Sequence, residues 1–155
     1  SILNICKKRK INVRIESKLN FNFENYDGII INSIGKLNSL YQLADIAFIG
    51  GSLFSNYGGH NFIEAAQNKC AIIVGPFMKN FEDILNLFKD TDSCIQIKSN
   101  SELSKAYKEL LNNNELRINM VDNAIGVIAN NKGSSDLQYK YLNKIINNEI
   151  NNGNN

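Results

Sequence analysis

The chain has 155 residues, of which 43% are hydrophobic, and its formal net charge at pH 7 is +2. This length and composition allow one domain with a buried core and exclude a largely disordered chain. The small charge, carried by lysines scattered along the sequence, argues against a nucleic-acid partner. The three cysteines are far apart without a C-x-x-C pair, so we expect no zinc site, no disulfide framework and no metal cofactor. No apolar run reaches the roughly 20 residues that cross a bilayer.

Short β-branched runs alternate with segments of helical period along the chain, which is typical of βα units around a parallel sheet. The runs do not alternate strictly between polar and apolar residues, as expected of strands covered by helices on both faces. We therefore predict an α/β fold with flanking helices. The expected strands are Ile11–Ile15, Gly28–Asn32, Ile46–Gly50, Ala71–Gly75 and Cys94–Ile97.

The expected helices begin near polar residues that can cap them. Asn80 is expected to cap the helix that starts at Phe81, and Ser101 is expected to cap the helix that starts at Glu102. The predicted domain covers residues 1–146, followed by an asparagine-rich tail at 147–155. The helices are expected at Leu37–Ala44, Asn61–Asn68, Phe81–Phe88, Glu102–Asn112, Glu115–Asn130 and Ser134–Ile146.

The segment from Phe48 to Glu64 carries two glycine pairs between a strand and a helix. Gly50 and Gly51 would let the backbone approach a ligand or a neighbouring strand, while Gly58 and Gly59 would permit positive φ in a tight turn. Ligands of open parallel sheets bind at the carboxyl ends of the strands, where this segment should lie. The layout predicts a nucleotide site.

Three polar residues follow the second glycine pair. Glu64 could accept hydrogen bonds from both ribose hydroxyls or only complement the helix dipole, and Asn61 could contact the ligand or only cap the helix. His60 has no partner spacing typical of a metal site or a nucleophilic triad. We therefore expect His60 to orient the ligand or contact a phosphate rather than act as a general base.

A second loop, Ile34-Gly35-Lys36, follows the second predicted strand. Its backbone N–H groups could hold a phosphate, or Gly35 could form an ordinary left-handed turn. Lys36 could add a positive charge beside an anion or be solvated.

Several motifs occur in a fixed order between about residues 14 and 130. They are Ile34-Gly35-Lys36-Leu37, then Leu40-Tyr41 followed by Ala44 through Leu53, then Gly58-Gly59-His60-Asn61-x-x-Glu64-Ala65-Ala66, and then Gly75-Pro76-x-x-x-Asn80-Phe81-x-Asp83-Ile84. Together they resemble the carboxyl-terminal half of bacterial 3-deoxy-D-manno-octulosonic acid (Kdo) transferases, enzymes that move Kdo from CMP-Kdo to lipid A precursor in lipopolysaccharide biosynthesis.

The resemblance implies a GT-B glycosyltransferase, of which this chain would be the second Rossmann-like domain, the one that binds the CMP-Kdo donor. It implies an inverting reaction without a metal, whose carboxylate base belongs to an amino-terminal half that also binds the acceptor. The full enzyme would work at the cytoplasmic face of the inner membrane, and this chain alone would be inactive. The implied donor-binding residues are Ile34, Gly35, Lys36, Ser52, Gly58, Gly59, His60, Asn61, Phe62, Ile63 and Glu64.

Two positions depart from the family pattern. Lys36 stands where the family usually has glutamate, and Phe62 stands where proline is common. A lysine cannot accept the hydrogen bonds that a glutamate accepts. Three alternatives stay open: a GT-B glycosyltransferase that uses a UDP-sugar, a degenerate, non-catalytic partner domain that docks to a separately encoded amino-terminal half, and a Rossmann-like domain that has lost ligand binding.

Overall fold

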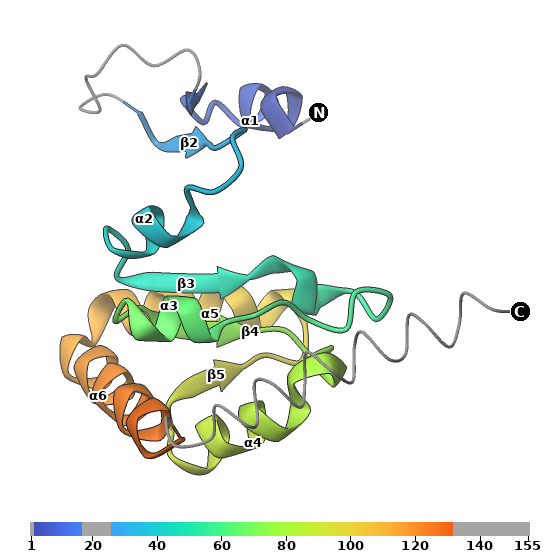
Figure 1. Cartoon of the computed structure of the whole chain (residues 1–155). Coiled ribbons are helices and arrows are strands. Elements are labelled where there is room, and N and C mark those ends of the chain that lie inside the picture. The colour runs from blue at the N-terminus through green and yellow to red at the C-terminus, as the bar shows by residue number, and fades with distance from the viewer. Residues whose placement is uncertain (1, 17–25, 132–155) are drawn as a thin grey trace, which may run out of the picture. The chain divides into compact units, whose positions relative to one another are not determined.

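The computed structural model describes residues 2–16 and 26–131 of the chain, which divides into two units, Ser1–Ser39 and Leu40–Asn155 (Figure 1). The predicted helix Ser134–Ile146 and the tail at 147–155 lie outside the described residues. Parallel strands and flanking helices are present, so the predicted α/β class is confirmed. The five predicted strands pair as two parallel sheets, one in each unit.

The first unit contains helix α1 (Ile2–Lys8) and the parallel strands β1 (Val13–Ile15) and β2 (Gly28–Ile30). Ile15 lies opposite Ile30 in the register, so the two strands end side by side. We did not predict α1. It buries none of its residues, and the apolar stripe by which a helix is usually found in a sequence has no core to face here. Helix α2 (Leu37–Tyr41) contains the boundary between the units.

The second unit is built on three parallel strands in the order β3 (Ile46–Ile49), β4 (Ala71–Val74) and β5 (Cys94–Gln96). All four residues of β4 are buried, because β4 has a strand on each side and helices over both faces. This is the burial that its uninterrupted apolar run predicts.

Alternate residues of β4 face two different cores. Ile72 and Val74 belong to one core, and Ala71 and Ile73 belong to the other. The first core takes Phe62 and residues of α3 (Ile63–Gln67), α4 (Glu82–Asp90) and the second half of α6 (Asn114–Asn131). The second core takes residues of α5 (Asn100–Asn112) and the first half of α6. The sheet is thereby held from both sides, and its carboxyl edge carries the loops of interest.

Both predicted helix caps are wrong. Helix α4 begins at Glu82, after a short 3-10 turn, and the Asn80 side chain instead donates a hydrogen bond from Nδ2 to the Tyr57 carbonyl oxygen at 3.2 Å. Ser101 lies inside α5, which begins at Asn100. The N-cap residues are Phe81 for α4 and Ser99 for α5, and neither makes a side-chain cap hydrogen bond.

Candidate functional site

The loops that leave β3 and β4 are joined at the carboxyl edge of the sheet by the buried residue Ser52. Its hydroxyl donates to the Ile49 carbonyl oxygen and accepts from the Gly75 N–H at 2.6 Å, while its carbonyl oxygen accepts from Phe77 N–H at 2.9 Å. A Cβ on Gly75 would clash with the Ser52 carbonyl oxygen. The predicted site residue Ser52 therefore has its hydroxyl engaged within the protein, and it ties the loop after β3 to the loop after β4.

Gly58 and Gly59 form a buried turn with φ of 63° and 88°, the left-handed values predicted for them. Asn80 closes this turn, because its backbone N–H donates to the Gly58 carbonyl oxygen at 2.9 Å. A Cβ on Gly58 would lie 2.8 Å from the Asn80 amide, and one on Gly59 would lie 2.5 Å from the sulfur of Met78. Only glycine fits both the backbone angles and the space at these two positions.

His60 lies against the other glycine pair. A Cβ on Gly51 would come within 2.5 Å of ring atoms Cε1 and Nδ1 of His60, whereas a Cβ on Gly50 would meet no atom within 4 Å. The group that lies against Gly51 is therefore the His60 imidazole and not a neighbouring strand, and the approach of a ligand to Gly50 and Gly51 stays a prediction. The Tyr57 ring stands 6.4 Å from the imidazole, centroid to centroid, and both residues are exposed.

The side chains from Asn61 to Glu64 differ in their exposure to solvent. Asn61 and Glu64 are exposed, whereas the Phe62 ring is fully buried and packs edge-on to Phe88 with 5.0 Å between centroids. Asn61 Oδ1 accepts the N–H of Ile63, the first residue of α3, at 2.9 Å, but the N-cap residue of this helix is Phe62 and not Asn61. This leaves the Asn61 amide nitrogen and the Glu64 carboxylate as the groups that can reach a ligand from this segment.

Tyr41 is a neighbour of Glu64 that the sequence analysis named only as part of a family motif. Burial, and secondarily the charges of Glu64 and Cys70, raise the pKa of the Tyr41 phenol. The phenol therefore stays protonated at neutral pH and can donate a hydrogen bond. The sequence held no signal for this, because the proximity of Tyr41 and Glu64 depends on tertiary packing.

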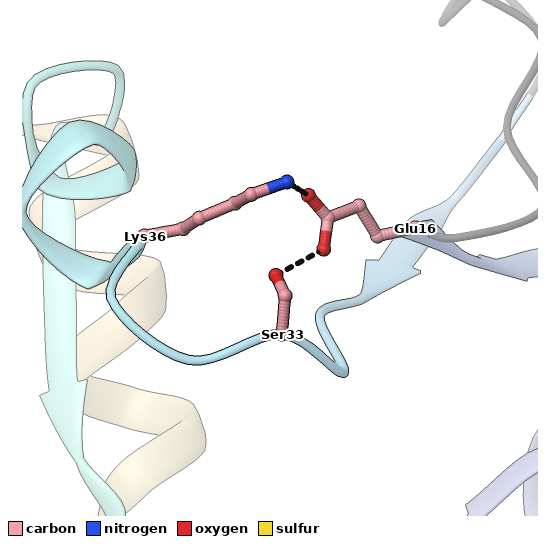
Figure 2. A network of polar contacts seen from close by, with 3 residues as sticks. All are labelled: Glu16, Ser33 and Lys36. Carbon is pink, nitrogen blue, oxygen red and sulfur yellow. Dashed lines mark hydrogen bonds and ion pairs between the residues drawn. The ribbon is translucent and has the colours of Figure 1, made fainter.

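In the first unit, the loop Ile34–Lys36 is exposed and Gly35 has φ of 85°, which is the left-handed turn considered for it. Lys36 Nζ is paired with the Glu16 carboxylate (Figure 2), and a contact of Lys36 with the ligand stays a prediction. Ser33 Oγ donates to the other Glu16 oxygen at 2.5 Å. The sequence analysis missed Glu16. A signal was present, because Glu16 directly follows the first predicted strand and Ser33 directly follows the second.

Neither a candidate metal site nor a candidate membrane span occurs in residues 2–16 and 26–131, the part of the chain that the structure describes. No three His, Cys, Asp or Glu residues of this part gather as they would around a metal ion. None of its helices combines the length and the apolar composition that a membrane crossing requires.

Comparisons with known proteins link the chain to one family. It is 34% identical over 134 residues to a 3-deoxy-D-manno-octulosonic acid transferase of Rickettsia prowazekii, an alignment that covers 85% of this chain and 29% of the relative. It is 30% identical over 150 residues to the enzyme of that name from Haemophilus influenzae, with 94% of this chain and 35% of the relative covered. This chain is homologous to part of the Kdo transferases. It spans about a third of the length of these two relatives.

The structural comparison agrees with the sequence comparison. The chain matches the C-terminal CMP-Kdo binding domain of WaaA from Acinetobacter baumannii with a TM-score of 0.76 and 24% identity, covering 82% of this chain and 66% of that one. No protein-family model matches the chain. The resemblance to the carboxyl-terminal half of Kdo transferases, drawn from the motifs, is confirmed, and so is the predicted fold.

Proposed function

We propose that this chain is the donor-binding domain of a Kdo transferase, an inverting glycosyltransferase of lipopolysaccharide biosynthesis. In the full enzyme, Kdo would pass from CMP-Kdo to lipid A precursor. The observation that carries this proposal is the Gly58–Glu64 segment: a family motif held at the carboxyl edge of a parallel sheet, in a chain homologous to Kdo transferases. The fold shared with a CMP-Kdo binding domain supports it.

Each residue of the segment has a part in the proposed site. Glu64 accepts hydrogen bonds from the ribose hydroxyls, and the Asn61 amide nitrogen donates to the nucleotide, since Asn61 Oδ1 is already used by Ile63. His60 contacts the phosphate or orients the donor. Gly58 and Gly59 bring the backbone close to the ligand.

The remaining predicted residues act through the backbone or through loop shape. Phe62 and Ser52 have buried side chains, so they contribute by holding the turn, and Ile63 contributes through its main chain. Ile34, Gly35 and Lys36 stay predicted contacts of the same nucleotide.

The chain alone should bind the donor without catalysing transfer. Inverting displacement needs a base within hydrogen-bond reach of the acceptor hydroxyl, and we assign no residue of this chain to that role. We place the base and the lipid A precursor site in another part of the full enzyme, which would work at the cytoplasmic face of the inner membrane.

Titration calorimetry with CMP tests the proposal. We expect the chain to bind CMP more tightly than UMP or UDP, and we expect Glu64→Ala to weaken CMP binding about tenfold or more, the loss of a charged hydrogen-bond partner. Glu109→Ala, which removes an exposed acid from α5, is the control and should bind CMP like the unaltered chain. Tighter binding of UDP would favour a UDP-sugar enzyme, and no binding of either nucleotide by a folded chain would favour a degenerate domain.

A further inference from the structure

The ends of β1 and β2 carry a network of three polar side chains. Glu16 directly follows β1, and Ser33 and Lys36 follow β2. The parallel register, with Ile15 opposite Ile30, brings these two strand ends together. As Figure 2 shows, one Glu16 oxygen accepts from Lys36 Nζ and the other accepts from Ser33 Oγ at 2.5 Å.

Glu16 binds a short turn, Ser33–Lys36, at its first and at its last residue. Ser33 and Lys36 are three residues apart, and Gly35 between them has a left-handed φ of 85°. Ile34 is fully exposed at 102%, and no atom would meet a Cβ on Gly35 within 4 Å. Side-chain packing at Ile34 and Gly35 therefore contributes little to the shape of the turn, whereas the Glu16 carboxylate binds it at residues 33 and 36.

The two charges differ in their exposure. The Glu16 side chain is 19% exposed and the Lys36 side chain is 56% exposed. An exposed ion pair contributes little to the stability of a whole protein, so the effect of this one is expected to be local. The hydrogen bonds from Lys36 and then Ser33 lower the pKa of the Glu16 carboxyl, so that it is ionised at neutral pH.

We propose that Glu16 is a positioning residue that clamps the Ser33–Lys36 turn through Ser33 and Lys36, so that the turn is already ordered when nucleotide binds. The Lys36 ammonium pairs with the Glu16 carboxylate and not with the ligand phosphate. An ordered turn binds its ligand more tightly because less conformational entropy is lost on binding. The role in binding rests on the function proposed above, but the clamp itself exists without ligand.

The first test measures the clamp in the full 155-residue chain without nucleotide. We expect backbone order parameters from ¹⁵N relaxation to be near about 0.85 for residues 34–36, as in rigid backbone, and to fall toward about 0.6 in Glu16→Gln. Glu82→Gln, which removes an exposed acid from α4, should leave these values unchanged. Residues 34–36 that are equally ordered in Glu16→Gln, or already mobile in the unaltered chain, would overturn the proposal.

The second test measures the titration of the Glu16 carboxyl group. Carboxyl ¹³C titration should place the Glu16 midpoint below the usual glutamate value, and Lys36→Met should raise it, because the ammonium no longer favours the carboxylate. The carboxylate therefore supports the turn above the unfolded pKa and loses this role as pH falls through the lowered folded pKa. A midpoint that does not move in Lys36→Met would contradict the pairing.

The third test exchanges the two charges and measures CMP affinity. Glu16→Lys should weaken CMP binding by roughly two- to fivefold, the scale of an exposed pair, and adding Lys36→Glu should restore most of the loss. If the clamp is present but affinity does not respond to Glu16→Lys, the positioning role is overturned while the proposed function stands. If the unaltered chain does not bind CMP, the proposed function fails, and the order parameters still decide whether the clamp exists.

Discussion

The contact between Gly51 and His60 shows how one missing methyl group can shape a binding surface. The imidazole occupies the space that a Cβ would fill, with Cε1 and Nδ1 within 2.5 Å of it. The ring therefore packs directly on the Gly51 backbone. The other residue of the pair, Gly50, has no such neighbour. The sequence alone could not tell which of the two glycines a side chain would contact.

We predict that Gly51→Ala displaces the His60 ring and weakens CMP binding about tenfold, the equivalent of one lost hydrogen bond. Gly50→Ala is the matched control, because a Cβ there meets no atom within 4 Å. Calorimetry on both variants, with circular dichroism to check folding, measures the difference. Equal affinities for the two variants would show that the position of His60 has no role in binding.

Single residues also mark the limit of the sequence analysis. The positive φ at Gly58 and Gly59 could be predicted, because a glycine pair in a turn has few other uses. The roles of Ser52 and Asn80 could not. Their partners, Gly75 and Tyr57, lie 23 positions away in the chain, and local sequence gives no information on which carbonyl or amide will be near.

At the scale of elements, the Phe62 and Phe88 rings pack in the core between the sheet of the second unit and helices α3 and α4. Phe88 is fully buried and packs edge-on to Phe62. Its neighbour in α4, Leu87, is 42% exposed. The buried residues of α4, Leu85 and Phe88, are three positions apart and so lie on one face of the helix.

Phe88→Ala should therefore lower the free energy of unfolding by about 3–5 kcal/mol, the usual cost of removing a buried phenylalanine ring. Leu87→Ala should cost less than about 1 kcal/mol. Urea denaturation followed by circular dichroism measures both changes. A similar cost for the two variants would contradict the packing described for α4.

The cysteines provide a second test of the element packing. Burial raises the pKa of the Cys94 thiol to about 12 and also raises the pKa of Cys70. Both are buried, while Cys6 is half-buried. At pH 8 a thiol-specific reagent should react fast with Cys6. It should react slowly with Cys70 and Cys94, since thiols with a raised pKa carry little thiolate. Three fast thiols in the folded chain would mean that the sheet is not packed as described, and denaturant should expose all three.

At the scale of the whole molecule, the sequence predicted five strands and the α/β class but not their division into two sheets. Strand runs are local signals, whereas pairing depends on which strands meet after folding. The homology covers about a third of the length of the two Kdo transferases compared. The proposed activity therefore belongs to a longer enzyme.

We predict that the purified chain transfers no Kdo when supplied with CMP-Kdo and lipid A precursor, because we assign the base for the acceptor hydroxyl to another part of the full enzyme. A radiolabelled transfer assay, with an intact Kdo transferase as the positive control, measures this. Transfer by the chain alone would place the base within it and overturn the division of roles proposed here.

The central claim is that a cytidine nucleotide binds at the carboxyl edge of the β3–β4–β5 sheet on the Gly58–Glu64 segment. The most direct measurement is an NMR titration of the ¹⁵N-labelled chain with CMP. We predict saturable shifts of the amide signals of residues 58–64, with further shifts in 34–36, and little change in α5. Saturable binding that leaves the signals of residues 58–64 unmoved would contradict the account.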